Sequence, residues 1–216
     1  MPYVPDLHVL LTAGYRVEHG GLACVVTPVD LGAVVLPTGR VVGCDPLIPR
    51  TTPFVEVVAP GRYELRAWVA VVHSDGGNSR RIAALQLVVA DAPTVSWTMA
   101  LLPGNDPASL GDDDYFGYLV DSGTATLADQ IAIEALSKWD YDQMDEAFIP
   151  AQIPADPIEA VLAAVVDEPT GANVYVVGAG WGDGVYATYV GRADDGQITS
   201  FVTDFGVVPV PPLTGL

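Results

Sequence analysis

The stretch from Asn173 to Phe205 constrains the fold most, because it holds three apolar runs separated by glycine-containing links. The runs cover residues 173–178, 185–191 and 198–205, and each has the length of a β-strand. The first link, Gly180–Gly184, has glycine at three of five positions, and glycine adopts positive φ and lets a backbone or ligand come close. The second link, 194–196, has the Asp-Asp-Gly sequence of a hairpin turn. We therefore predict a meander of three strands.

Upstream of this stretch the sequence indicates short strands joined by turns. The 22 glycines and 18 prolines are scattered along 216 residues, which favours many turns over a helical bundle. We expect strands within residues 5–12, 21–27, 31–45 (two strands around a turn at 37–39), 54–58, 62–71, 81–90, 95–101 and 116–121. The first hundred residues thus predict a mainly antiparallel sheet.

Two capping patterns predict helices between this sheet and the meander. Thr126 followed by Asp129 is typical of a capping box, and would start a helix that runs to about Trp139. Asp156 followed by Pro157 is typical of an N-cap and first helical residue, for a helix over 158–166. The chain therefore predicts a single α+β domain over residues 1–208, a mainly antiparallel sheet or sandwich with two helices inserted before a C-terminal three-strand meander. We expect the Pro-rich tail, 209–216, to be loosely ordered.

The charge of the chain is strongly negative and unevenly placed. The formal net charge is −18; residues 1–100 hold 8 acids against 7 arginines, whereas residues 101–216 hold 19 acids against Lys138 and Arg192. Such a second half repels nucleic acid and anionic membranes, and it attracts cations or a basic protein surface. A general solubility role of the acids is the alternative.

From its cysteines and its apolar segments we expect the protein to be cytoplasmic. Cys24 and Cys44 lack the spacing of a zinc site or a disulfide framework, which fits a reducing compartment. The first residues lack the features of a signal peptide, and no apolar run approaches the roughly 18 residues of a membrane span. We therefore predict a soluble protein without nucleic-acid or membrane partners. The oligomeric state stays open.

Several short pieces, in one order along the chain, are typical of one protein family. They are Pro37-Thr38-Gly39-Arg40-Val41-Val42 with Asp45-Pro46, Pro60-Gly61-Arg62-Tyr63, Val120-Asp121-Ser122-Gly123, Gly180-Trp181-Gly182-Asp183-Gly184-Val185-Tyr186, and Asp204-Phe205. On these pieces the chain resembles the bacterial domain-of-unknown-function family 4241. The resemblance implies a shared fold; because that family has no established activity, it implies no mechanism and no catalytic residue.

The candidate binding residues are four aspartates and two aromatic residues. The aspartates each follow or flank a predicted strand end, so they could converge to bind a divalent cation or to share a proton in acid–base chemistry; alternatively each one caps its own turn. The aromatic residues could form a wall for a small ligand or plug the end of a sheet. The set is Asp45, Asp121, Trp181, Asp183, Tyr186 and Asp204. No cofactor is evident, and the catalytic residues are unknown.

Three functions remain open, and we favour a binding or interaction protein. The uneven charge favours an inhibitor- or immunity-like protein that docks a basic partner. The Gly-Trp-Gly-Asp-Gly loop with Tyr186 favours a small-ligand module. The alternative is a hydrolase or lyase that uses the aspartates, with or without a divalent metal. Residues 101–216 contain one Lys and no His, which are groups that enzymes commonly use.

Overall fold

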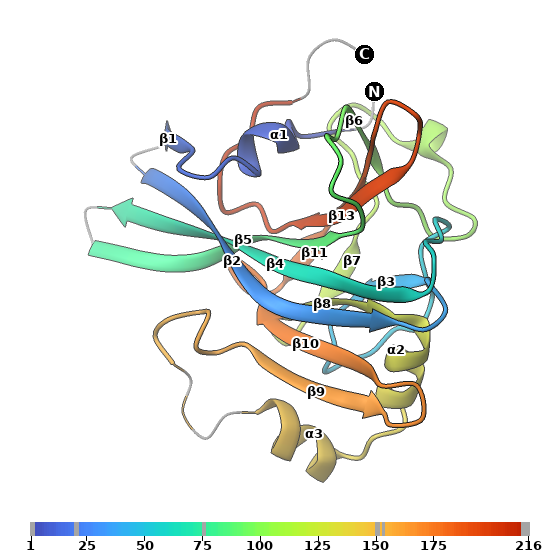
Figure 1. The fold of residues 1–216 in the computed structure, drawn as a ribbon. Coiled ribbons are helices and arrows are strands. Elements are labelled where there is room, and N and C mark those ends of the chain that lie inside the picture. Colours follow the sequence, from blue (N-terminus) through green and yellow to red (C-terminus); the bar gives the residue numbers. More distant parts are fainter. Residues whose placement is uncertain (1–2, 20–21, 75–76, 150–151, 153, 213–216) are drawn as a thin grey trace.

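A seven-stranded sheet dominates the computed structural model, which describes residues 3–19, 22–74, 77–149, 152 and 154–212 (Figure 1). The strand order is β1-β2-β4-β5-β13-β12-β6, and every pairing is antiparallel. The strands are β1 (Arg16–His19), β2 (Leu22–Leu36), β4 (Gly61–Ser74), β5 (Gly77–Val88), β6 (Ser96–Met99), β12 (Thr188–Arg192) and β13 (Ile198–Asp204).

A four-stranded sheet and a two-stranded ribbon complete the β-structure. The smaller sheet has the order β3-β8-β10-β9, and the ribbon pairs β7 with β11, again antiparallel. Their strands are β3 (Val41–Cys44), β7 (Tyr118–Val120), β8 (Thr124–Asp129), β9 (Leu162–Asp167), β10 (Ala172–Gly178) and β11 (Gly184–Tyr186). The helices are α1 (Leu7–Leu10), the 3-10 turn η1 (Pro107–Ser109), α2 (Gln130–Leu136) and α3 (Tyr141–Phe148). The α+β class is confirmed.

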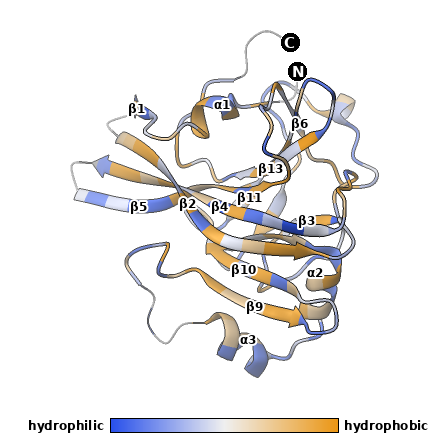
Figure 2. Ribbon diagram, in the orientation of Figure 1, coloured by the Kyte–Doolittle hydropathy of each residue, from blue (hydrophilic) through white to orange (hydrophobic). Residues whose placement is uncertain are grey.

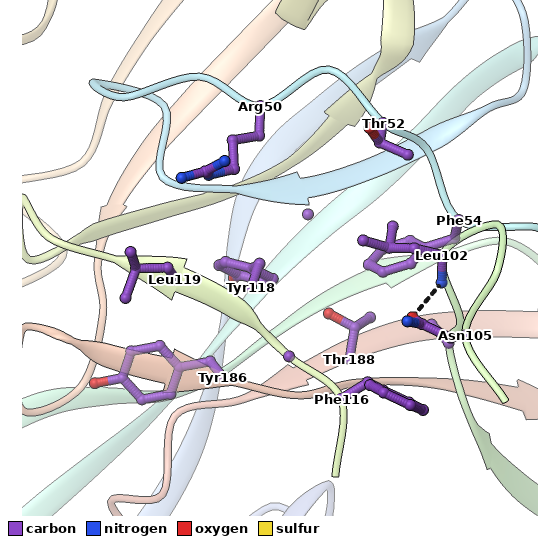
Figure 3. Close-up of a pocket in the computed structure, with 13 residues that line it drawn as sticks. Arg50, Thr52, Phe54, Leu102, Asn105, Phe116, Tyr118, Leu119, Tyr186 and Thr188 are labelled. Carbon is purple, nitrogen blue, oxygen red and sulfur yellow. Dashed lines mark hydrogen bonds between the residues drawn. The ribbon is translucent and has the colours of Figure 1, made fainter. Parts of the chain in front are cut away.

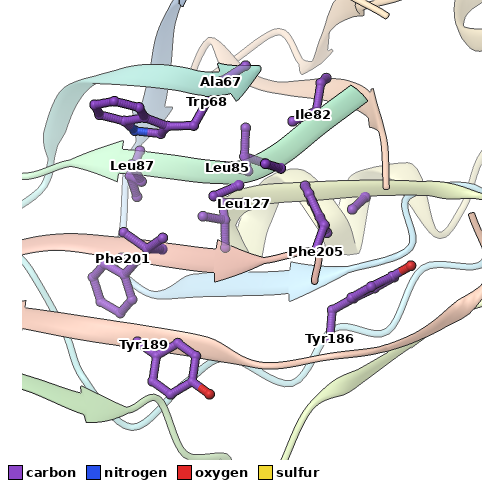
Figure 4. Packing of buried hydrophobic residues seen from close by; sticks show 14 of the residues in the cluster. Ala67, Trp68, Ile82, Leu85, Leu87, Leu127, Tyr186, Tyr189, Phe201 and Phe205 are labelled. Atoms are coloured by element: carbon purple, nitrogen blue, oxygen red, sulfur yellow. The ribbon is translucent and has the colours of Figure 1, made fainter. Parts of the chain in front are cut away.

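The smaller sheet lies between the larger sheet and the helices α2 and α3 (Figure 1). Leu127 of β8 and Val177 of β10 belong to the main core, together with residues of β4 and β5. Figure 4 shows Leu127 close to Leu85 in this core. Residues on the opposite face of the smaller sheet, such as Val174, pack with α2 and α3 in a second cluster. In Figure 2 the strands of these layers are largely hydrophobic, whereas α3 carries hydrophilic residues.

The predicted meander is only partly correct, because its three apolar runs divide among three sheets and only the hairpin of the last two runs is present. The run 173–178 is β10 of the smaller sheet, and 198–204 is β13 of the larger one. The middle run is broken at Ala187 into β11, which pairs with β7, and β12, which pairs with β13. The glycine-rich link thus carries the chain from one sheet to another. Apolar runs identify strands, but they do not specify the neighbour with which each one pairs.

The segment 31–45 also divides between sheets. Residues 22–36 form the continuous strand β2, with a register shift at Asp30–Gly32, where Asp30 accepts a hydrogen bond from the N–H of Gly32. After the turn at 37–39 the chain enters β3, which pairs with β8 and not with β2. The expected strand at 54–58 is reduced to a single bridge between Val57 and Arg40.

The N-terminal segment 5–12 contains α1 where a strand was predicted. Leu7 and Leu10 are both fully buried, as expected for residues three apart on one helical face. The expected loose tail is held to this segment as far as Pro212, which forms a bridge with Pro5. The N–H of Asp6 also donates to the carbonyl of Pro211. Residues 213–216 lie outside the described residues.

The first predicted helix begins later than expected. Residues 124–129 form β8, in which Thr126 pairs with Cys44, so the Thr126–Asp129 capping box is wrong. The helix α2 starts after Asp129, whose carboxylate accepts a hydrogen bond from the N–H of Ile131. Apolar residues both precede and follow Asp129, so the hydrophobic pattern here fits a strand and a helix equally.

The second predicted helix does not form. Residues 156–160 make turns, in which Asp156 accepts a hydrogen bond from Ile158, and 162–167 form β9. The missed helix is α3, where Asp140 and Gln143 make a capping box. Among the described residues, no helix has the length and hydrophobicity that crossing a membrane requires.

Candidate functional site

Three of the six predicted residues lie on two neighbouring loops, which we call the acidic rim (Asp121, Trp181 and Asp183). Val120, the last residue of β7, pairs with Gly184, the first residue of β11. Asp121 directly follows Val120, and Asp183 directly precedes Gly184, so the two aspartates lie at the same end of the ribbon. The loops are also joined by a hydrogen bond from the N–H of Ala179 to the carbonyl of Gly123, at 2.9 Å. All three rim side chains are exposed. The structure therefore brings this part of the predicted set together.

Asp45 lies beneath the acidic rim as a structural residue. Its side chain is 2% exposed, directly after β3. Its carboxylate accepts hydrogen bonds from the backbone N–H groups of Leu47, Asp121 and Ser122 and from the Ser122 hydroxyl, at 2.7–3.0 Å. Because four donors already surround the carboxylate, Asp45 would have to break these bonds before it could bind a ligand.

Trp181 is held in place by an arginine from the larger sheet. The guanidinium of Arg81 lies 4.2 Å from the centre of the indole, a cation–π arrangement. The same guanidinium donates to the carbonyl of Gly180 at 3.1 Å. The indole is nevertheless 49% exposed. The Arg81 contacts hold the glycine-rich loop against β5, and the indole of Trp181 stays partly accessible to solvent.

The remaining two predicted residues, Tyr186 and Asp204, line a second feature, which we call the tyrosine pocket. This pocket has a volume of about 300 Å³. It is lined by Tyr3, Tyr115, Val185, Tyr186, Ala187, Tyr189, Asp204, Gly206, Val208, Pro209 and Val210. Asp204 is its one charged side chain among these described residues. Tyr186 connects the pocket to the acidic rim, because its hydroxyl donates to the carbonyl of Gly182 at 2.8 Å.

The side-chain donors of the tyrosine pocket are already used. Of the described lining residues, only the tyrosines carry side-chain donors, and each hydroxyl donates to a backbone carbonyl. The pairs are Tyr3 with Val210, Tyr115 with Val185, Tyr186 with Gly182, and Tyr189 with Tyr3. Asp204 accepts through Oδ1 from the N–H of Gly206 at 2.8 Å, and its Oδ2 accepts no hydrogen bond from a described residue. The side chains of the pocket therefore offer acceptors.

Burial changes the acid–base chemistry of the tyrosine pocket. The pKa of Asp204 is raised to about 6, because burial disfavours the carboxylate more than the Gly206 N–H stabilises it. The pKa values of Tyr3 and Tyr189 are also raised, first by burial and then by the nearby Asp204 carboxylate. Asp204 is thus a carboxylate at neutral pH whose proton affinity is well above the ordinary range.

The predicted convergence of four aspartates is only partial. Asp45, Asp121 and Asp183 gather at the rim, while Asp204 lies in the tyrosine pocket. No group of three or more His, Cys, Asp or Glu residues in the described part of the chain could hold a metal ion. Cys44 is buried and free, and burial raises the pKa of its thiol to about 12, which disfavours a nucleophilic thiolate.

The comparison with known protein families covers all but the last of the pieces singled out in the sequence. The sequence model of one family, the protein of unknown function DUF4241, matches residues 34–203. The chain belongs to this family. No curated protein and no solved structure matches the chain. The matched region contains the acidic rim of this DUF4241 protein and five of the eleven residues that line its tyrosine pocket, and it ends just before Asp204.

Sequence reasoning missed three residues of the tyrosine pocket: Tyr3, Tyr115 and Tyr189. They come from the N-terminal segment, from the loop before β7 and from β12. No spacing in the sequence links these positions, since only the pairing of β12 with β13 and the docking of the N-terminal segment bring them to Asp204. Of the four tyrosines, only Tyr186 was predicted, because it lies next to the glycine-rich loop.

Proposed function

We propose that this DUF4241 protein binds a small organic cation in the tyrosine pocket, with the Asp204 carboxylate as the opposing charge. The observation that carries the proposal is the donor and acceptor inventory of the pocket. The hydroxyl hydrogens are directed to backbone carbonyls, and Asp204 Oδ2 lacks a donor among the described residues. A ligand that complements these side chains is positively charged or rich in N–H donors.

Aromatic rings support the same ligand class. Four tyrosines line the tyrosine pocket, and aromatic rings attract ammonium groups through their quadrupoles by about 0.5–2 kcal/mol each. The volume of about 300 Å³ lies at the small end of ligand pockets, which span about 300–1,000 Å³. Together, size and lining favour a compact alkylammonium or quaternary ammonium compound.

The charge of the whole chain supports a cationic ligand as well. The net charge of −18 is concentrated in residues 101–216, which contribute Asp204 and the acidic rim. Such a field raises the local concentration of cations and accelerates their association at low salt. The same field favours a basic protein partner, as predicted from the sequence, but the pocket gives the small ligand the more specific support. The aspartate-based hydrolase has less support, because Asp45 is committed to four hydrogen bonds.

Calorimetric titration at pH 8 and low salt tests the proposal with choline and with its uncharged analogue 3,3-dimethylbutan-1-ol. We expect choline to bind and the alcohol to bind at least ten-fold more weakly, since a charge-assisted contact contributes about 1.5–3 kcal/mol. Asp204→Asn should weaken choline binding at least ten-fold. Butylammonium, titrated in the same way, distinguishes preference for primary or quaternary ammonium groups.

Asp194→Asn is the matched control, because Asp194 is exposed in the turn between β12 and β13 and the substitution removes the same charge. We expect it to change choline affinity less than two-fold. Equal weakening by the two substitutions would mean that only the general field matters. Equal affinity for choline and the neutral alcohol would reject a cation site altogether.

A further inference from the structure

A second cavity, of about 390 Å³, shares Tyr186 with the tyrosine pocket (Figure 3). We call it the Arg50 cavity. Three segments that are distant in sequence form its walls: residues 50–54 after β3, residues 100–105 after β6, and residues 116–119 with Tyr186 and Thr188. Tyr186 lines both cavities, but Arg50 lines only this one.

The floor of the Arg50 cavity is apolar and closely packed. Phe54 and Tyr118 are 7% and 8% exposed, and both rings approach Gly43 of β3. A Cβ at Gly43 would lie 2.9 Å from the Tyr118 ring and 3.0 Å from the Phe54 ring, so a larger residue would displace them. This surface suits a flat apolar body that stacks on aromatic rings.

Arg50 and Asn105 supply side-chain donors to the Arg50 cavity. Arg50 is the one charged side chain among the described lining residues, and no acid accompanies it there. Its guanidinium forms no ion pair within the described part of the chain. Asn105 accepts from the N–H of Leu102 through Oδ1, which leaves its amide N–H groups as donors. In Figure 3 Arg50 and Asn105 lie at opposite ends, with Tyr118 and Thr188 between them.

Arg50 forms no ion pair within the described residues although the chain has 27 acidic and 9 basic residues. Three other arginines have carboxylate partners, in the pairs Arg66 with Glu64, Arg80 with Asp156 and Arg192 with Glu56. A guanidinium that lines an apolar cavity without such a partner has the geometry to bind a planar carboxylate through two parallel hydrogen bonds.

We infer that the Arg50 cavity binds a small organic carboxylate with a flat apolar body. Arg50 would bind the carboxylate, the rings of Phe54 and Tyr118 would contact the body, and Asn105 would donate to an acceptor at the far end. This site does not rest on the proposed function, because its ligand has the opposite charge and Arg50 lies outside the tyrosine pocket.

Calorimetric titration with benzoate, benzamide and acetate tests the inference on the unmodified protein. We expect benzoate to bind at least ten-fold more tightly than benzamide, which lacks the charge, and than acetate, which lacks the ring. Phenylphosphonate, titrated alongside, distinguishes a preference for carboxylate from one for any anion. Benzamide as tight as benzoate would reject a charged contact, and acetate as tight as benzoate would reject the apolar body.

Substitution of Arg50 tests which residue makes the contact. Arg50→Gln should weaken benzoate binding ten- to a hundred-fold, and Arg50→Lys should weaken it less, since lysine keeps the charge but loses the planar fork. Arg62→Gln is the control, because Arg62 is an exposed arginine on β4 outside the cavity. Its effect should be less than two-fold. Unchanged benzoate affinity in Arg50→Gln, or an equal loss in Arg62→Gln, would overturn the assignment.

Discussion

Asp45 and Ser122 are joined by two hydrogen bonds, from the Ser122 backbone N–H to Oδ2 at 2.8 Å and from its hydroxyl to Oδ1 at 2.7 Å. The two residues lie 77 positions apart in the chain. The contact fastens the end of β3 to the turn between β7 and β8, and this turn supports the acidic rim. A residue that was a candidate ligand is thus part of the framework that positions the candidate site.

We predict that Asp45→Asn destabilises the protein by about 2–4 kcal/mol. An asparagine amide would place N–H donors against the backbone donors of Leu47 or Ser122, and would leave buried groups without partners. Urea denaturation measures the loss. Asp121→Asn is the control: Asp121 is exposed, so its substitution should change stability by about 0.5 kcal/mol or less. Similar effects of the two substitutions would mean that the network around Asp45 contributes little.

The strands that could be predicted from sequence are those with a clear local pattern. The expected strand at 62–71 and the hairpin sequence at 194–196 correspond to β4 and to the β12–β13 turn. Pairing partners were not predictable, because β2 and β3 join different sheets on either side of one short turn. The contacts that decide this pairing join residues distant in the sequence, so no local sequence pattern indicates them.

The candidate site shows the same division. Asp121 and Asp183 could be proposed together from the sequence because both lie at the ends of predicted strands. Arg50 could not, since nothing near it in sequence marks a cavity, and the walls come from segments about 50, 70 and 140 residues away. Asp204 was predicted, but its tyrosine neighbours depend on sheet order and on the docking of Tyr3.

A buried helix cap should stabilise the fold more than an exposed one. Asp129 is fully buried; it caps α2 through Ile131, and also accepts hydrogen bonds from the backbone and hydroxyl of Thr38. Asp140 caps α3 in an exposed position. We predict that Asp129→Ala costs about 2–4 kcal/mol and Asp140→Ala about 1 kcal/mol in urea denaturation. Equal costs would contradict the contribution of Thr38.

The close approach at Gly180 gives a further prediction. Gly180 has φ of +51°, and a Cβ there would lie 2.8 Å from both the Cβ and the carbonyl oxygen of Phe205. Gly171 also has positive φ, +72°, but a Cβ would meet nothing within 4 Å. We predict that Gly171→Ala costs about 1–2 kcal/mol from backbone strain alone. Gly180→Ala should cost about 1–3 kcal/mol more, from the additional clash. Thermal unfolding of the two variants, compared at one pH, measures the difference.

The raised pKa of Asp204 predicts how stability depends on pH. Its ordinary pKa is 3.8, whereas the folded protein raises it to about 6, so between these values the folded state holds more protons than the unfolded state. This carboxyl therefore makes folding less favourable as the pH rises from about 4 to 7, by on the order of 2–3 kcal/mol in total. The difference in unfolding free energy between the wild type and Asp204→Asn, measured by urea denaturation at each pH, isolates this term. The difference should shift in favour of Asp204→Asn as the pH rises, and a constant difference would contradict the burial of the carboxylate.

Binding of a cation should offset the cost of burying the Asp204 carboxylate. The affinity for the ligand should therefore depend on whether Asp204 is protonated. An ammonium group stabilises the carboxylate form, so the ligand and the proton compete for Asp204. With a pKa of about 6, choline should bind about ten-fold more weakly at pH 5 than at pH 8, with little change above pH 7. Choline itself does not titrate in this range, so the profile reports on the protein. Calorimetric titration across this range measures it, and the residual binding in Asp204→Asn should be flat. A flat profile in the unmodified protein would place the cation elsewhere, because no ligand that contacts the Asp204 carboxylate can be indifferent to its proton.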